Sequence, residues 1–515
     1  MTKRIWQYGM LWTVVLAACA PAAAPTAAPA PAATALVEAK RTITAEDMRT
    51  RIGFLASDSL RGRNTPSPGL EAAAEYLAAQ LRGMGLQPAG GEGSYIQRFP
   101  YRQISLDGAA ARLTLQGPQG APALAYGRDF FTIPAAVDSV SGTAVFIGPA
   151  TRFMRPDPLT GISGRIVVAT VGVQPGSEIF MAAQRIASAG AVGLLFVLHP
   201  LHTPQVVEQI ATQVAGLGFE MPIPTFGVRY EHAQALFRAA GVNETVLADT
   251  AGPAQPQALP RTTLRMSAPV GRIEHPVPNV VAVLPGSDPQ LSSEYVILTA
   301  HFDHVGVGQP DAQGDSIYNG ADDNASGTAV VLEVAEAFSR LPQRPARSVI
   351  FLLVSGEEKG LLGARYYADN PTVPIERVVA NINLDMVGRN APDTLVAIGQ
   401  EYTSLGPLTL RIAQANPQLR LNVITDPNPE EQAFFRSDHV AFLRKDIPAI
   451  FFTTWLHEDY HRPSDEVERI DIEKAARVGQ LVFLLAHEVA SAPERPAWLG
   501  DGLQQVREIL RMSPF

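Results

Sequence analysis

Two adjacent glutamates, Glu357 and Glu358, follow one of the most apolar stretches of the chain, "RSVIFLLV". An apolar run of this length predicts a buried strand, so both carboxylates should stand at its carboxyl end. Buried or half-buried like charges repel each other and lose their hydration. The pair therefore indicates a site where positive charge compensates the carboxylates.

Imidazoles and further carboxylates follow the other apolar runs of the second half of the chain. They are His301 and Asp303 after "YVILTA", Asp385 after "VVANINL", and His461 and Asp465 after "IPAIFFTTW". The loop "NGADDNASG" adds Asp322 and Asp323 just before a predicted helix. The carboxyl ends of strands form the binding crevice of an open α/β sheet, so these side chains should converge there.

A mixture of imidazole and carboxylate groups is typical of a zinc site. Two divalent ions would need a bridging carboxylate and would lie ~3.5–4 Å apart, an arrangement used for hydrolysis. One glutamate of the pair could then bind metal while the other takes a proton from water. Each residue alone has an ordinary structural explanation, such as an Asp that caps a helix. Their joint placement at successive strand ends is what favours the metal site.

The elements that position these residues predict an α/β fold with two domains. Residues 44–63 and 69–90 show helical spacing, and strands alternate with helices after residue 276. That alternation indicates a mixed, largely parallel central sheet flanked by helices. Short β-rich runs past residue 125 predict a small inserted α/β module at 127–266, so the main domain is expected at 41–126 and 267–500.

The first 40 residues are expected to lie outside the fold. Residues 1–19 combine Lys3 and Arg4 with an apolar stretch and small residues, which is typical of a signal peptide. "LAAC" resembles a lipobox, which implies lipidation of Cys19, the only cysteine of the chain. Residues 20–40 are interpreted as an Ala/Pro tether. The protein is therefore expected to be exported and anchored to a membrane as a periplasmic or cell-surface lipoprotein, with plain secretion as the alternative. By resemblance, Ala20 after the cysteine favours the outer membrane if the host has one.

The balance of charge argues against one class of partner. The formal net charge is −9 and the sequence holds no basic run, so a nucleic-acid partner is not expected.

Six motifs follow one another along the chain: "HFDH", "NGADDNASG", "SGEEKGLLG", "NLDMVG", "SDHVAF" and "YHRPSD". Their order and rough spacing resemble those of the di-zinc aminopeptidase family, to which glutamate carboxypeptidases and, by relation, the transferrin receptor belong. The resemblance implies a zinc exopeptidase fold. "GRIVVATVG" and "AAQRIASAGAVGLLFV" resemble a protease-associated domain, which would be the module at 127–266.

The resemblance implies two zinc ions and their ligands. His301 and Asp385 would bind one ion, Glu358 and His461 the other, and Asp323 would bridge both.

The resemblance also implies the residues that do chemistry beside the metals. Glu357 would be the general base that activates water, and Tyr460 would stabilise the oxyanion of the reacting carbonyl. Asp303 would support His301, and Asp465 would support His461, because carboxylates behind metal-bound imidazoles orient them.

The function expected on these grounds is an aminopeptidase that removes N-terminal residues from peptides. A glutamate-type carboxypeptidase would need basic residues for a substrate carboxylate, and Arg389, Arg436 and Arg462 lie near the motifs. Two more functions stay open, a glutaminyl cyclase-like enzyme with one zinc ion and a non-enzymatic receptor lipoprotein. The module at 127–266 is expected to gate access to the crevice.

Overall fold

The structure is a computed structural model that describes residues 31–118, 122–154, 160–173, 178–215, 219–253 and 255–512. The expected signal peptide, the lipobox at Cys19 and most of the expected tether lie outside these residues. Within them, none of the helices combines the length and apolar character needed to cross a membrane.

The larger unit is built on a nine-stranded sheet, in which β2 (Ile96–Leu106) pairs with β10 beside the main path. The strands of that path, in spatial order, are β1 (Gln87–Pro88), β10 (Val270–Leu284), β14 (Ser348–Val354), β11 (Tyr295–His301), β15 (Val378–Leu384), β18 (Ala449–Thr453), β16 (Thr394–Ile398) and β17 (Asn422–Ile424). Strands β14, β11, β15 and β18 are parallel, whereas β10 runs antiparallel to its neighbours. Strand β16 runs antiparallel to β18 and parallel to β17. The predicted mixed, largely parallel sheet is confirmed.

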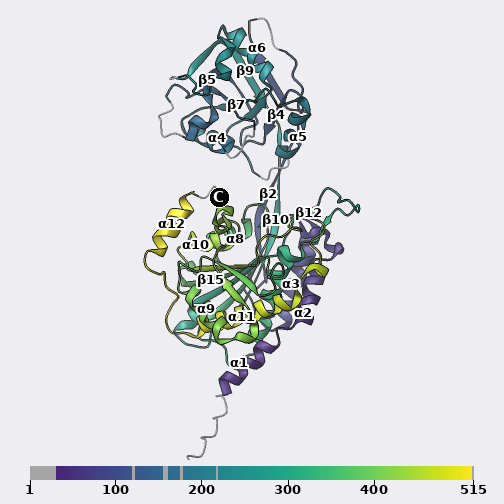
Figure 1. Ribbon diagram of the computed structural model, residues 1–515, viewed down its shortest axis with the longest axis vertical. Coiled ribbons are helices and arrows are strands. Elements are labelled where there is room, and N and C mark those ends of the chain that lie inside the picture. The colour runs from purple at the N-terminus through teal and green to yellow at the C-terminus, as the bar shows by residue number, and fades with distance from the viewer. Residues whose placement is uncertain are drawn as a thin grey trace, which may run out of the picture.

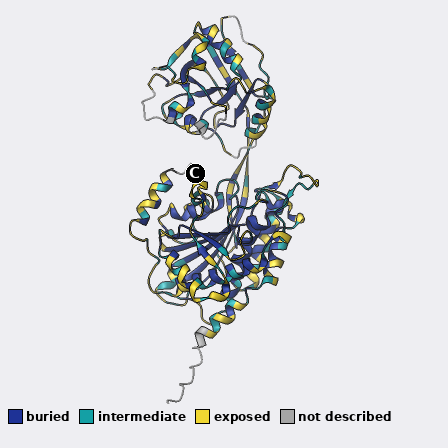
Figure 2. Ribbon diagram, in the orientation of Figure 1, coloured by how far each residue is buried: buried dark blue, intermediate teal, exposed yellow. Residues whose placement is uncertain are grey.

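Helices cover both faces of this sheet (Figure 1). One face carries α2 (Ala45–Leu55), α3 (Pro68–Gly83), α7 (Gly327–Ser339), α9 (Leu405–Ala415) and α11 (Ile472–Ser491). The other face carries α8 (Leu362–Asp369) and α10 (His439–Leu443). Along β14, Phe351 packs on the first face and Ile350 on the second, as the alternation of side chains in a strand requires. Figure 2 shows the buried layer between the helices.

The inserted module has its own seven-stranded sheet and its own core. The strands in spatial order are β3 (Arg112–Gln116), β9 (Gln257–Ser267), β5 (Ser139–Pro149), β6 (Ile166–Thr170), β7 (Gly193–Val197), β8 (Thr225–Val228) and β4 (Phe130–Ile133), with helices α4 (Glu178–Ser188), α5 (Pro204–Ala215) and α6 (Tyr230–Ala240). Because β3 pairs with β9, the module begins before the expected boundary at residue 127. The boundary was misplaced because a strand of five residues, such as β3, is too short to produce a recognisable pattern of apolar residues in the sequence.

A two-stranded ribbon joins the module to the main sheet (Figure 1). Residues 96–106 of β2 pair with residues 270–280 of β10. Strand β10 is antiparallel to β14, so its first residues extend past the carboxyl end of β14. The base of the ribbon packs Phe99, Tyr101 and Val277 against α8. The module therefore stands on the side of the sheet where the parallel strands end.

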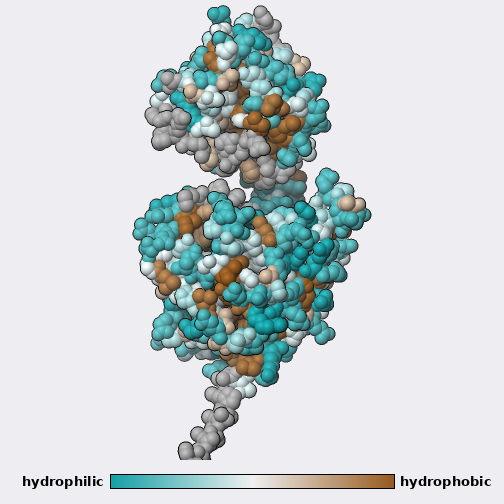
Figure 3. Space-filling view, in the orientation of Figure 1, coloured by the Kyte–Doolittle hydropathy of each residue, from teal (hydrophilic) through white to brown (hydrophobic). Residues whose placement is uncertain are grey.

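Both ends of the main domain differ from expectation. Residues 31–41 form helix α1 (Pro31–Arg41), whose Ala39 is buried in the main core, so the end of the expected tether at 20–40 belongs to the fold. At the other end, α12 (Gly502–Met512) buries Val506 and Leu510 against residues of the main domain, which extends past residue 500. A short hairpin of β12 (Gly306–Val307) and β13 (Ile317–Tyr318) follows β11. Figure 3 shows a largely hydrophilic surface with small apolar patches.

Candidate metal centre

The structure brings the five predicted ligands together at the carboxyl ends of the parallel strands. His301 ends β11, Glu358 and Asp385 follow β14 and β15, Asp323 lies in the turn before α7, and His461 lies in the loop after β18. His301 Nε2 lies 3.2 Å from Asp385 Oδ1 and 3.4 Å from Asp323 Oδ1. His461 Nε2 lies 3.1 Å from Asp323 Oδ2 and 3.1 Å from Glu358 Oε2. Asp323 thus presents one oxygen to each histidine, as a bridging carboxylate does.

The ligand atoms form two groups that share Asp323. The first group is His301, Asp323 and Asp385, and the second is His304, Asp323, Glu358 and His461. Within each group all ligand atoms lie within 4.8 Å of one another. His304 was not among the predicted site residues, although it is the second histidine of the motif "HFDH".

The adjacent glutamates have different surroundings. Burial raises the pKa of Glu357 well above its ordinary value, and the charges of Glu358 and Asp385 add to the rise. Burial alone would also raise the pKa of Glu358, but the adjacent imidazoles of His304 and His461 hold it well below the ordinary value. Glu357 belongs to neither ligand group, and its Oε2 lies 4.0 Å from His301 Nε2. Glu358 therefore contacts the imidazoles of His304 and His461, whereas Glu357 lies beside His301.

The two predicted supporting carboxylates lie in different places. Asp303 Oδ1 lies 3.7 Å from His301 Nδ1 and also accepts the backbone N–H of Glu357 (3.2 Å), so it stands behind the predicted histidine. Asp465 was expected to support His461. Its carboxylate instead accepts the backbone N–H groups of Asp322 (3.0 Å) and Asp323 (3.1 Å).

The location of Asp465 corrects the expected role. The backbone N–H of Asp465 closes a turn on the carbonyl of Arg462 (3.2 Å), and the carboxylate faces the loop before α7. Burial and the charge of Asp322 raise its pKa to about 6. Asp465 therefore holds the loop that carries the bridging carboxylate.

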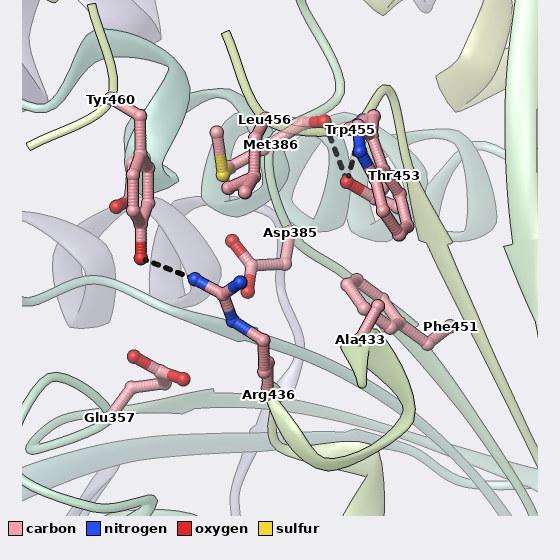
Figure 4. A pocket seen from close by; sticks show the side chains of 11 residues that line it. Glu357, Asp385, Met386, Ala433, Arg436, Phe451, Thr453, Trp455, Leu456 and Tyr460 are labelled. Carbon is pink, nitrogen blue, oxygen red and sulfur yellow. Dashed lines mark hydrogen bonds between the residues drawn. The ribbon is translucent and has the colours of Figure 1, made fainter. Parts of the chain in front are cut away.

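An open pocket of about 490 Å³ adjoins the ligand groups (Figure 4). Its lining residues are Asp323, Glu357, Asp385, Met386, Ala433, Arg436, Phe451, Thr453, Trp455, Leu456 and Tyr460. Three of these side chains are acidic, and Met386, Ala433, Phe451, Trp455 and Leu456 add apolar surface.

Tyr460 lies in this pocket, as its predicted role requires. Its ring stacks on His461 with centroids 3.9 Å apart, and its hydroxyl accepts a hydrogen bond from Arg436 Nη2 (3.4 Å). Burial raises the pKa of Tyr460, so its hydroxyl keeps its proton and can donate it in a hydrogen bond. Of the three arginines near the motifs, Arg436 lines the pocket, whereas Arg389 pairs with Asp459 (2.6 Å).

Comparison with known proteins finds a match to a family model within this unit. Residues 279–486 match peptidase family M28. A probable zinc metalloprotease of Leptosphaeria maculans is 28% identical over 266 residues, which cover 44% of this chain and 60% of that protein. Aminopeptidase YwaD of Bacillus subtilis is 28% identical over 213 residues, which cover 39% of this chain and 43% of that protein. The chain thus spans about half the length of these curated relatives.

A solved structure shows that the likeness extends to the whole fold. The aminopeptidase from Aneurinibacillus sp. strain AM-1 superposes with a TM-score of 0.53 and 20% sequence identity, covering 89% of this chain and 97% of that one. At this identity the likeness concerns the fold alone. It confirms the predicted fold class.

Two residues that lie outside the M28 segment contact the loops next to the metal groups, and the sequence did not reveal them. Arg63 is fully buried and donates to the backbone carbonyls of Leu55, Phe302, Asn319 and Gly320. Burial lowers the pKa of Arg63 to about 10, against the opposing charges of Asp303 and Asp323. Thr65 Oγ1 donates to Asp303 Oδ2 (3.0 Å) and accepts the N–H of Gly356 (3.1 Å). The segment before α3 therefore fixes the loops of the metal groups.

Within the M28 segment, the motif "SDHVAF" supplies further buried groups. Ser437 Oγ donates to Asp385 Oδ2 (2.8 Å), which orients that predicted ligand. Asp438 is fully buried, and neither carboxylate oxygen has a hydrogen-bond partner among the described residues. Burial raises the pKa of Asp438 to about 8, and the charges of Asp385 and Asp303 contribute. The motif is recognisable in the sequence, but the sequence does not reveal what its residues contact.

Proposed function

We propose that this chain is a zinc-dependent aminopeptidase that uses two zinc ions to hydrolyse the N-terminal peptide bond of its substrates. The observation that carries the proposal is the position of Asp323, whose two oxygens face His301 and His461 and so join two ligand groups. Glu357 stands beside these groups without belonging to either. The match to family M28 over residues 279–486 supports the same activity.

The residues present fit zinc. Carboxylates and imidazoles are its usual oxygen and nitrogen ligands. Glu358 Oε1 and His461 Nε2 are buried, and neither has a hydrogen-bond partner among the described residues. A cation bound between them would satisfy both atoms. Bound zinc would supply Lewis-acid activation of water and of the scissile carbonyl.

The side chains around the metal groups would perform the remaining steps. Glu357 takes a proton from the attacking water and returns it to the leaving amine, as general base and then general acid. The backbone N–H of Glu357 donates to Asp303 Oδ1, and this hydrogen bond fixes the backbone from which the Glu357 side chain extends. Tyr460 donates a hydrogen bond to the carbonyl oxygen as negative charge develops there.

The pocket supports the choice of an aminopeptidase with a preference for apolar N-terminal residues. Met386, Phe451 and Leu456 line its wall and would contact an apolar side chain. Glu357, whose carboxylate belongs to neither ligand group, lines the same pocket and favours a cationic α-amino group.

One observation favours a carboxypeptidase as the second candidate. The guanidinium of Arg436 projects into the pocket beside the hydroxyl of Tyr460 (Figure 4). A guanidinium can bind a substrate carboxylate through two parallel hydrogen bonds. An enzyme that used Arg436 in this way would require a free C-terminus within one residue of the scissile bond.

Hydrolysis assays distinguish the two activities. An aminopeptidase cleaves leucine amide and leaves N-acetylated dipeptides intact, whereas a carboxypeptidase does the reverse. Zinc removal by a chelator should abolish either activity, and added zinc should restore it. If neither class of substrate is cleaved by the zinc-loaded protein, the proposal of a peptidase is wrong.

The remaining features of the chain are assigned by proposal as well. The inserted module would be a protease-associated domain that restricts access to the crevice. The direction of the β2–β10 ribbon supports this role, because the ribbon extends from the side of the sheet where the parallel strands end. Export and anchoring through a lipid on Cys19 rest on the motif "LAAC".

A further inference from the structure

A buried histidine that the predicted ligand set does not include points into one of the two ligand groups. His304 has no exposed surface. Its Nδ1 lies 2.8 Å from Glu358 Oε1 and 3.6 Å from Asp323 Oδ2. Its ring centroid lies 5.5 Å from that of His461. Two imidazoles and two carboxylates thus surround one point.

The contact between His304 and Glu358 lacks the geometry of a hydrogen bond. Neither ring nitrogen of His304, nor Glu358 Oε1, has a hydrogen-bond partner of suitable angle among the described residues. His461 shows the same combination, because its Nε2 lies 3.1 Å from two carboxylate oxygens and also lacks a partner of suitable angle. Close approach without alignment indicates that these atoms face a shared third point rather than one another.

Packing fixes the ring of His304 in this orientation. Gly320 lies against the ring, and a Cβ atom at that position would come within 2.5 Å of Cγ and 2.6 Å of Cδ2. The backbone N–H of His304 donates to the carbonyl of Arg63 (3.3 Å). The ring is therefore held without a hydrogen bond to its own nitrogens, which leaves them available to a cation.

We propose that His304 is a further ligand of the position formed by Glu358 and His461, and that the two metal positions are consequently unequal. The inference rests on the proposed two-zinc function. The position of His304, Asp323, Glu358 and His461 has four protein ligands, which is typical of closed zinc sites that bind tightly. The position of His301, Asp323 and Asp385 has three, which is typical of catalytic sites that keep a place for water.

The location of Glu357 agrees with this assignment. Its Oε2 lies 4.0 Å from His301 Nε2, on the side of the three-ligand position. The proposed general base therefore stands beside the position that keeps a place for water. The four-ligand position would chiefly hold the bridging carboxylate in place.

Zinc titration of chelator-treated protein against a competing indicator tests the inference. Wild-type protein should bind one equivalent tightly and a second at least tenfold more weakly. His304→Ala should weaken the tight equivalent at least a hundredfold, because a ligand is lost, and leave the weak equivalent within a few-fold. His487→Ala, which removes a half-buried histidine of α11 outside both ligand groups, is the matched control and should leave both affinities unchanged.

A second variant separates coordination from hydrogen bonding. His304→Asn retains an N–H close to the position of Nδ1 and could still donate to Glu358, but it removes the imidazole ligand. It should lose tight binding as His304→Ala does. If His304→Asn binds zinc as tightly as the wild type, His304 only positions Glu358 and the inference is overturned.

Spectroscopy of the cobalt-substituted protein gives a readout that does not depend on hydrolysis. The first equivalent of Co²⁺ should show a changed d–d absorption spectrum in His304→Ala, whereas His301→Ala should change the spectrum of the second equivalent. Equal affinities in the wild type, or unchanged spectra in His304→Ala, would overturn the inference even if peptides are hydrolysed. Two unequal positions without hydrolysis would leave it standing and refute the proposed function instead.

Discussion

Replacing each of the two adjacent glutamates by glutamine tests the proposed division of their roles. Glu357→Gln keeps the size of the side chain and removes the carboxylate that would accept a proton. Glu358→Gln removes the negative charge that faces His304 at 2.8 Å and His461 at 3.1 Å. The first variant should lose catalysis and the second should lose metal.

The expected magnitudes follow from these surroundings. General acid–base catalysis contributes about 10²–10⁴-fold, so Glu357→Gln should raise the barrier by about 3–5 kcal/mol. It should retain near-normal zinc content, because Glu357 belongs to neither ligand group. Loss of an anionic ligand in Glu358→Gln should weaken zinc binding by more than the roughly 10–100-fold that loss of an outer-shell partner costs.

Metal analysis after dialysis, combined with kcat/KM for leucine amide at rising zinc concentration, measures both effects. Added zinc should restore part of the rate of Glu358→Gln and none of the rate of Glu357→Gln. Loss of zinc from Glu357→Gln, with full metal in Glu358→Gln, would show that the roles are exchanged. Full metal and full activity in both variants would refute the catalytic interpretation of the pair.

Four further predictions concern other parts of the chain. Asp438→Asn should raise the Tm of metal-free protein more at pH 9 than at pH 4. Protonated Asp438 contributes stability that is complete below its unfolded pKa of 3.8 and is lost as the pH rises to its folded pKa of about 8. An equal gain in Tm at both pH values would contradict this. Arg63→Met should lower the free energy of unfolding in urea by about 3 kcal/mol or more and weaken zinc binding, because buried carbonyls lose a charged donor; a change under about 1 kcal/mol would refute this role. Replacing residues 107–269 by an Asn-Gly turn should close a hairpin, because Leu106 and Val270 are paired. The shortened protein should still hydrolyse leucine amide. A rate below a hundredth of the wild-type rate in folded, zinc-loaded protein would show that the module does more than gate access to the crevice. Cys19→Ser should release the protein from membranes in its native host without loss of activity, and wild-type protein recovered in the soluble fraction without a lipid on its N-terminus would contradict this.

The location of the candidate site could be predicted because its predicted ligands follow apolar strands. The runs that became β11, β14 and β15 are long and uninterrupted, and parallel strands necessarily end at one edge of the sheet. Any polar residue directly after such a run is therefore delivered to the same crevice. This argument placed His301 and Asp385 without knowledge of the register.

The residues that were missed make contacts with no sequence pattern. Arg63 bonds to backbone carbonyls as far as 257 residues away, and a carbonyl is the same at every position of the chain. The direction of Asp465 depends on a loop turn, and its real partners are likewise backbone groups. His304 was visible in "HFDH", but its inward orientation depends on packing against Gly320, which no sequence pattern reveals.

The contact between Arg63 and the carbonyl of Gly320 also imposes an order of events on a chain that is still being synthesised. At roughly 5–20 residues per second, about 13–50 s pass between the emergence of these two residues. The inserted module, with its own core, is completed in that interval and can fold while the ribosome works. Helices α2 and α3 have no sheet to cover during the same time, and the apolar faces that carry Ile52 and Leu77 stay available to chaperones. The nascent chain therefore passes through a stage in which the inserted module can already be folded, while helices α2 and α3, which were synthesised earlier, still lack the sheet on which they pack.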